Sequence, residues 1–104
     1  MDYILILCTI NEIESARKIS KTLVSEKLAA CVNIIPNLTS IYTWNGQIEE
    51  DSEYLMLIKT KQTLFDKVKT RITELHPYET CEVISIKIDN GSKPYLDWIN
   101  NSVQ

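Results

Sequence analysis

One short segment, residues 74–82, holds most of the side chains in this chain that could do chemistry. It reads Glu74-Leu75-His76-Pro77-Tyr78-Glu79-Thr80-Cys81-Glu82, and so contains the only histidine, one of three cysteines and three carboxylates. Imidazole, thiolate and carboxylate are the side-chain groups that bind transition metals. Pro77 also restricts the backbone beside it to an extended conformation. Any chemical site in this chain is therefore expected to include part of this segment.

The composition indicates a soluble protein that does not bind nucleic acid. The chain has 104 residues, of which 44% are hydrophobic and 24% charged, with a net charge of −3. These fractions are ordinary for a globular protein, and the length suits one domain over residues 1–104. Its 11 basic residues are scattered along the sequence. Proteins that bind nucleic acid usually gather their basic residues on one face.

The sequence shows no sign of membrane insertion or export. No apolar stretch approaches the ~20 residues that a membrane-spanning helix needs. The N-terminus has no basic residue ahead of its apolar run, as a signal peptide would. Cys8, Cys31 and Cys81 are odd in number and far apart, which suits reduced thiols better than a disulfide framework. These features predict a cytoplasmic protein without a membrane partner.

Hydrophobic patterns divide the chain into four strands and three helices. The apolar run at residues 3–8 predicts a strand buried on both faces. Asn11 is expected to cap the next helix, with Glu14 completing a capping box. The remaining elements are listed by range: helices over 12–27 and 64–75 and from Ser92 or Lys93 onward, and strands over 31–42, 48–60 and 82–88. Asn45-Gly46 predicts a tight hairpin turn, because both residues tolerate positive φ.

The order βαββαβ followed by a terminal helix predicts a ferredoxin-like α+β sandwich with a long central hairpin. Right-handed crossovers give an antiparallel sheet of strand order 4-1-3-2, with the two longer helices on one face. The first and third strands are apolar on both sides, yet helices would cover only one side. The uncovered face predicts an oligomer. The free length of the hairpin also offers unpaired edges to a neighbouring subunit.

This topology predicts a site where the first strand ends. Cys8 lies there, Cys81 and Glu82 begin the fourth strand beside it, and the second helix ends nearby at His76. Two structural alternatives stay open. Cys8 can be a small buried hydrophobe, as Cys31 is expected to be. A charged His76 can also interact favourably with the C-terminal end of the helix.

Catalysis has little support in the sequence. A cysteine and a histidine could act as nucleophile and base, but no third group or oxyanion loop is evident. The two glycines both fall in turns, which leaves no loop of the usual kind for binding phosphate. We therefore expect that the chain is not an enzyme.

Several motifs resemble those of the CutA divalent-cation tolerance family. They are Leu7-Cys8-Thr9, Leu28-Ala29-Ala30-Cys31-Val32-Asn33-Ile34-Ile35-Pro36, Thr39-Ser40-Ile41-Tyr42-Thr43-Trp44-Asn45-Gly46-Gln47-Ile48-Glu49, Leu57-Ile58-Lys59-Thr60, His76-Pro77-Tyr78-Glu79 and Tyr95-Leu96-Asp97-Trp98-Ile99. Together they cover nearly the whole chain in the right order. The resemblance implies a homotrimer whose long hairpins pair sheets around a threefold axis, with a likeness to PII-type signalling trimers. It also implies a non-catalytic role in divalent-cation tolerance and in the response to metal ions.

The resemblance further implies two kinds of site. Binding of copper or another divalent cation is attributed to Cys8 and His76, with Glu82 as a weaker candidate for the third ligand. Clefts between subunits are lined by residues like Lys59, Tyr78, Glu79 and Trp44, although Tyr78 and Trp44 suit subunit packing equally well. An alternative function is therefore a PII-like signalling trimer that holds a small anion or nucleotide in this cleft.

One position departs from the family pattern. Cys81 stands where the family commonly has proline, in a His-Pro-Tyr-Glu-x-Pro-Glu run. The change restores a backbone donor and adds a soft ligand, which would favour Cu(I) or Zn²⁺ over hard cations. Alternatively, Cys81 simply fills the space of the proline, and we prefer this second interpretation.

Overall fold

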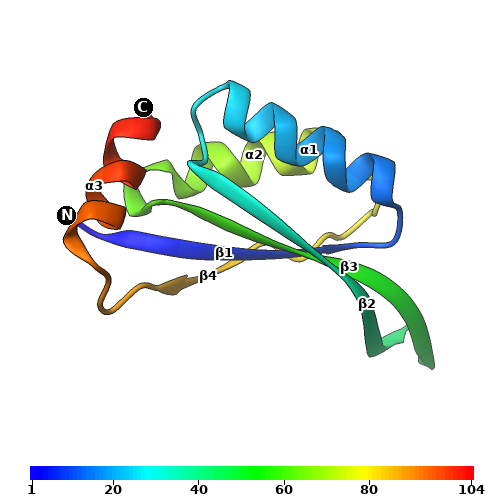
Figure 1. Cartoon of the computed structure of the whole chain (residues 1–104). Helices are drawn as coiled ribbons and strands as arrows, with labels where there is room; N and C mark the ends of the chain where they lie inside the picture. The colour runs from blue at the N-terminus through cyan, green and yellow to red at the C-terminus, as the bar shows by residue number, and fades with distance from the viewer.

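Four strands and three longer helices make up the structure, a computed structural model that describes all residues from Met1 to Gln104. The sheet forms one layer, and α1 and α2 pack together on one of its faces (Figure 1). In chain order the elements are β1 (Tyr3–Ile10), α1 (Ile13–Ser25), β2 (Cys31–Trp44), β3 (Gln47–Lys61), the short 3₁₀ helix η1 (Gln62–Leu64), α2 (Phe65–Leu75), β4 (Ile84–Lys87) and α3 (Lys93–Ser102). This is the expected ferredoxin-like α+β arrangement. None of the helices is long and apolar enough to cross a membrane.

The sheet is antiparallel throughout, and its strand order is β2-β3-β1-β4. Read from the β4 edge, this is the order 4-1-3-2 that the crossover rule predicts. Each strand-helix-strand crossover places its helix on the same face because such connections are right-handed. The middle of the sheet is therefore formed by β1 and β3, the two most apolar strands.

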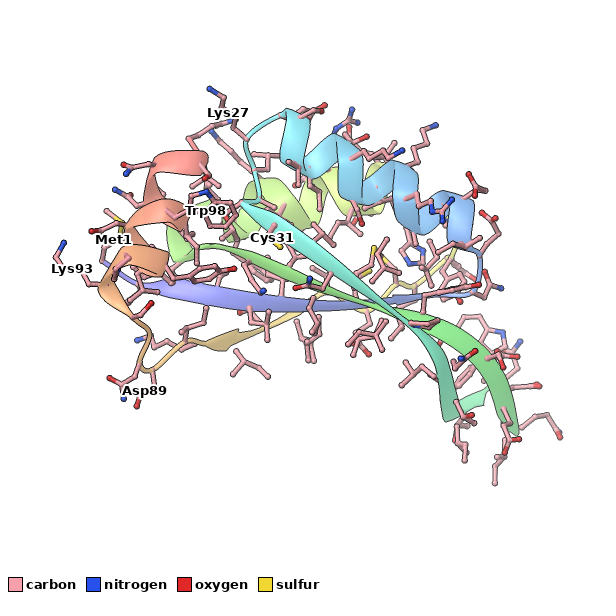
Figure 2. The ribbon with its side chains drawn as sticks, viewed as in Figure 1. Met1, Lys27, Cys31, Asp89, Lys93 and Trp98 are labelled. Atoms are coloured by element: carbon pink, nitrogen blue, oxygen red, sulfur yellow. The ribbon has the colours of Figure 1, made fainter.

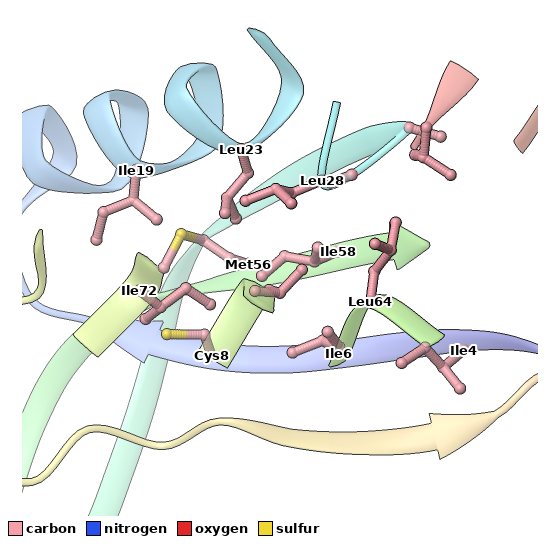
Figure 3. Packing of buried hydrophobic residues seen from close by; sticks show 14 of the residues in the cluster. Ile4, Ile6, Cys8, Ile19, Leu23, Leu28, Met56, Ile58, Leu64 and Ile72 are labelled. Atoms are coloured by element: carbon pink, nitrogen blue, oxygen red, sulfur yellow. The ribbon is translucent and has the colours of Figure 1, made fainter. Parts of the chain in front are cut away.

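Alternate residues of β1 form the centre of the core. Ile4, Ile6, Cys8 and Ile10 are all buried beneath the helices. Figure 3 shows this packing, in which side chains from both strands and helices meet. Other core residues beside them include Ala16, Ile19 and Leu23 of α1, Val68 and Ile72 of α2, and Met56 and Ile58 of β3. Burying one such aliphatic side chain contributes about 1.5–3 kcal/mol to stability.

Along each strand, the residues that alternate with the core residues point to the other side of the sheet. There they form an open sheet face that α1 and α2 do not cover. Figure 2 shows side chains projecting from the sheet on the side away from α1 and α2. We define the apolar part of this open sheet face by Leu5, Leu7, Ile35, Leu55, Leu57, Ile84 and Ile86. Ile84 and Ile86 are 53% and 54% exposed. A single chain thus leaves a contiguous apolar surface uncovered, as the sequence predicts.

The β2–β3 hairpin extends well beyond the rest of the sheet (Figure 1). Strand β1 pairs with β3 only from Tyr54 to Lys61, so the remainder of the hairpin has no other strand beside it. Its turn residues, Asn45 and Gly46, have φ angles of 51° and 78°. Such left-handed conformations are the ones that Asn-Gly turns tolerate, so the predicted turn is confirmed.

Two local predictions are wrong. Glu12, rather than Asn11, caps α1, and its carboxylate accepts hydrogen bonds from the backbone N–H groups of Ser15 (2.7 Å) and Glu14 (2.9 Å). No capping box forms, because the cap lies one residue later than expected. Strand β4 is also shorter than the range 82–88, since its ladder with β1 begins only at the Leu7–Ile84 pair.

Candidate functional site

Cys8 lies within β1 rather than at its end, because the strand continues to Ile10. Its side chain is fully buried and points toward the helices. Burial, and to a smaller extent the charges of Cys81, Glu82 and Glu53, together raise the pKa of the thiol to about 12. The thiol is therefore protonated at neutral pH, whereas the thiolate is the form that binds metals.

His76 follows α2 and is 8% exposed. Its Nδ1 accepts a hydrogen bond from the backbone N–H of Tyr78 at 3.1 Å, so the proton resides on Nε2, which donates to the carbonyl oxygen of Thr9 at 2.8 Å. Burial lowers the pKa of the imidazole, although the Thr9 hydrogen bond and the charge of Glu53 oppose this shift. His76 is thus a neutral residue with both nitrogens engaged, and it joins the end of β1 to the loop after α2. The alternative role, in which a charged His76 interacts with the C-terminal end of α2, is therefore not supported.

Glu82 lies just before β4 and is exposed. Neighbouring atoms still exclude part of the water around its carboxyl group, and this partial desolvation, together with the charge of Glu53, raises its pKa. Cys81 and Glu82 are both near enough to Cys8 to affect its titration. The topology therefore brings these residues to one end of the sheet, as predicted, with His76 at the same end. However, no group of three or more His, Cys, Asp or Glu side chains in the chain is arranged to hold a metal ion.

The residue that links these groups electrostatically is Glu53 of β3, which the sequence analysis missed. It is only 7% exposed, and its Oε2 accepts a hydrogen bond of 2.6 Å from the hydroxyl of Tyr78. Residues 56, 58 and 60 of the same strand are buried, so strict alternation would have placed residue 53 outside. The register shift between Ile35 and Leu38 places its extra residue in β2, so Glu53 keeps the side of β3 opposite that of residues 56, 58 and 60. It is buried on that side, where the hydroxyl of Tyr78 contacts it.

A cavity of about 420 Å³ opens beside these residues, between the outer half of the hairpin and the loop after α2. We call it the acidic pocket and define it by its lining residues: Thr9, Asn11, Ser40, Tyr42, Trp44, Asp51, Glu53, Tyr78, Glu79, Thr80 and Glu82. Four of these residues are carboxylates, three are aromatic and none is basic. The Tyr42 hydroxyl donates a short hydrogen bond to Asp51, which raises the pKa of Tyr42 to about 12.

Three of the four residues predicted to line a cleft lie in the acidic pocket, namely Trp44, Tyr78 and Glu79. The fourth, Lys59, lies further along β3, opposite Cys31 and Leu5 in the strand register. Its ammonium nitrogen is 5.6 Å from the centre of the Tyr95 ring in α3. One chain therefore does not bring Lys59 together with the other three.

A second hollow, of about 390 Å³, lies between α2 and the end of α1. Arg71 in its lining makes a two-point ion pair with Glu26, with nitrogen–oxygen distances of 3.0 and 2.9 Å. Gln104 donates a further hydrogen bond of 3.0 Å to the carbonyl oxygen of Glu26. These contacts hold the C-terminus against the helix layer, and the lining of the hollow includes the basic residues Lys67 and Arg71 as well as carboxylates.

Comparisons with known proteins agree with this fold. The family described as "CutA1 divalent ion tolerance protein" matches residues 4–102. The divalent-cation tolerance protein CutA of Thermus thermophilus is 48% identical over 97 residues, which cover 93% of this chain and 94% of that protein. Human protein CutA is 49% identical over 84 residues, which are 81% of this chain but 47% of the human protein, so the match spans about half of it. The crystal structure of CutA from Xylella fastidiosa superposes with a TM-score of 0.97 at 40% identity and covers 100% of both chains.

Proposed function

Because this chain belongs to the CutA1 divalent ion tolerance family, we propose that it acts in divalent-cation tolerance as a cytoplasmic homotrimer that binds copper or another divalent cation. The observation that carries the proposal is the family match over residues 4–102, which includes every candidate ligand. The cytoplasmic location rests on the odd, widely spaced cysteines.

The trimer is supported by surfaces that one chain leaves uncovered. The open sheet face is apolar and lacks a helix layer, and such a surface is usually covered in solution. Ile41 and Ile48 on the hairpin are 67% and 80% exposed. The hairpin is formed by β2 and β3, and beyond Tyr54 its outer edges have backbone groups free to pair. A neighbouring copy would cover the sheet face and the hairpin together.

Cys8, His76 and Glu82 are the ligands that we propose for the cation. In a single chain they do not form a ready-made metal centre, because Cys8 is protonated and both nitrogens of His76 are engaged. Binding therefore requires loss of the thiol proton and release of one hydrogen bond of His76. A bound ion would supply positive charge at an end of the sheet that has several carboxylates.

We further propose that the protein is not an enzyme. The only histidine has no free nitrogen to act as a base toward Cys8. The rival function, a signalling trimer that binds an anion or nucleotide, gains no support from one chain. The pocket that contains Trp44, Tyr78 and Glu79 has no basic residue, and Lys59 lies elsewhere.

The test is a titration of the reduced protein with Cu(I), Cu²⁺ and Zn²⁺, with the mass of the assembly checked by native mass spectrometry. Wild type is compared with Cys8→Ser, His76→Ala and Glu82→Gln, and Cys31→Ser serves as a matched thiol control. We expect stoichiometric binding that is lost in Cys8→Ser and His76→Ala, weakened in Glu82→Gln and unchanged in Cys31→Ser. Equal binding by all five proteins would exclude these ligands.

A further inference from the structure

Both glycines of the chain directly follow an asparagine, and the two Asn-Gly steps lie in very different structures. Asn45-Gly46 forms the turn between β2 and β3. Asn90-Gly91 lies in the loop between β4 and α3, outside any helix or strand. Figure 2 labels the preceding residue, Asp89, where this loop projects from the body of the molecule. The same pair of residues is thus present once in a paired turn and once in an open loop.

An asparagine that is followed by glycine can be modified without an enzyme. The backbone nitrogen of the glycine bonds to Cγ of the asparagine side chain and loses its proton, and the side-chain nitrogen leaves with a proton as ammonia. The product is a five-membered cyclic imide, which water opens to aspartate or to isoaspartate. Glycine favours the first step because it has no Cβ beside the attacking nitrogen. Asparagine is accordingly one of the thermolabile residues of proteins.

The backbone nitrogen of Gly91 is free to attack. Its N–H group takes part in none of the backbone hydrogen bonds of the loops and turns. The glycine is also required by packing against α3, because a Cβ at this position would lie 2.9 Å from Cδ2 and 3.1 Å from Cγ of Leu96. The contact with Leu96 therefore keeps a residue without a side chain directly after Asn90.

The side chain of Asn90 is held only by its neighbour in the sequence. It is exposed, and its one hydrogen bond, of 3.1 Å, is donated by Nδ2 to Oδ2 of Asp89. No helix or strand fixes the bond between Cα and the carbonyl carbon of Asn90, which has to rotate before Cγ can reach the next backbone nitrogen. Bringing two reacting groups into contact is a large part of the barrier of such reactions. The loop leaves Asn90 free to make this rotation.

Asn45 has the same neighbour but a fixed backbone. Trp44 and Gln47 pair across the turn, and the ladder between β2 and β3 continues from them. The φ angles of 51° at Asn45 and 78° at Gly46 belong to the left-handed region that this kind of turn requires. Ring closure would have to rotate Asn45 out of this conformation and open the end of the hairpin. The fold therefore opposes at Asn45 the reaction that it permits at Asn90.

We propose that Asn90 is a site of spontaneous modification in the folded protein, at which the side chain cyclises onto Gly91 and is then hydrolysed to aspartate and isoaspartate, while Asn45 is spared. Aspartate adds a negative charge shortly before the N-terminus of α3, where negative charge is favourable. Isoaspartate adds one atom to the backbone, which displaces Gly91 from its close contact with Leu96. The inference does not depend on the metal-tolerance proposal, because it uses none of the proposed ligands.

The experiment is a time course of the full chain at mildly alkaline pH, in native buffer and in guanidinium chloride, followed by digestion with trypsin and peptide mass spectrometry. Cleavage after Lys59 and Lys87 places the two Asn-Gly steps in separate peptides. Conversion is measured as the gain in mass when an amide becomes an acid, and isoaspartate is identified with a methyltransferase specific for it. Asn45 is the control within the same molecule. Asn90→Gln is the matched variant, because glutamine would have to close a larger ring.

We expect Asn90 to convert at least about tenfold faster than Asn45 in the native protein, which corresponds to a difference of about 1.4 kcal/mol in the barrier. In denaturant the two rates should agree within about threefold, because only the fold separates them. Asn90→Gln should show no conversion at this position. Conversion of Asn45 as fast as that of Asn90 in the native protein would overturn the proposal. It would also be overturned if Asn90 stayed unmodified in the native protein while both sites converted in denaturant, since the loop would then prevent ring closure.

Discussion

The hydroxyl of Tyr78 donates a hydrogen bond of 2.6 Å to Glu53 Oε2, which ties the loop after α2 to strand β3. The same loop is tied to the end of β1 by the hydrogen bond from His76 to Thr9. The two rings contact each other edge to face, with their centres 4.5 Å apart. Residues 76–78 are therefore held by polar contacts to both central strands. These contacts set the shape of the acidic pocket.

Removal of the Tyr78 hydroxyl should destabilise the protein. In Tyr78→Phe the buried carboxylate of Glu53 loses its only donor, while the ring packing is kept. We expect a loss of about 1–2 kcal/mol in the free energy of unfolding, measured by urea denaturation at neutral pH. Tyr42→Phe is the matched control, because Tyr42 also donates to a carboxylate, that of Asp51, but at an exposed position. A loss in Tyr42→Phe as large as that in Tyr78→Phe would contradict the role of burial.

His76 should make the protein less stable in mild acid. Its folded-state pKa lies below the ordinary value of 6.5, so the unfolded chain binds a proton more readily than the folded chain does. Stability from the neutral imidazole is therefore complete above about pH 6.5 and is lost as the pH falls through the lowered pKa. Glu82 has a raised pKa in the folded protein, so its contribution to stability decreases as the pH rises.

The measurement for His76 is the free energy of unfolding at several pH values, in wild type and in His76→Gln. The difference between the two curves isolates the histidine from the carboxylates. We expect this difference to be constant above about pH 7 and to shrink below about pH 6.5. A difference that does not change with pH would show that His76 titrates normally in the folded protein.

Much of the fold could be predicted because β1 and β3 are continuous apolar runs and Asn45-Gly46 is a strong turn signal. Strand order followed from the handedness of crossovers. The cap of α1 could not be assigned, since Asn11 and Glu12 both have side chains able to accept the free N–H groups.

The site was predicted only in part. Topology placed Cys8, His76 and Glu82 at one end of the sheet, but it could not give the direction of each side chain. The β1 pleat turns Cys8 toward the helices, and His76 is used to fasten a loop. Glu53 was missed because it is buried beside Tyr78, which lies 25 residues away in the loop after α2. Contacts between segments this far apart in sequence are set by tertiary packing rather than by residue pattern.

Cys8 should react with alkylating agents far more slowly than the other thiols. Its raised pKa, about 12 against an ordinary 9.0, lowers the thiolate fraction roughly a thousandfold, and its side chain is fully buried. Cys31 and Cys81 are both partly exposed and should be labelled well before Cys8. Peptide mass spectrometry after timed treatment with iodoacetamide measures the order. Labelling of Cys8 at the rate of Cys81 without denaturant would show that β1 opens easily.

The open sheet face should be the surface through which copies of this chain associate. Ile84→Glu places a charge on the β4 side of this face, opposite Leu7. Because Ile84 is 53% exposed in one chain, the substitution should lower the free energy of unfolding of an isolated subunit only slightly. In an assembly the same charge would be buried without a partner, which is strongly unfavourable. We therefore expect sedimentation equilibrium to show a trimer for wild type and a monomer for Ile84→Glu.

Val24→Glu is the matched control for this experiment. Val24 is 42% exposed on α1, in the helix layer on the other side of the sheet, and it receives the same substitution. Its variant should keep the wild-type mass, because the helix layer is expected to face solvent. If Val24→Glu dissociated the assembly and Ile84→Glu did not, copies would associate through the helices instead. Comparison of the two variants thus tests which face is covered, independently of any bound cation.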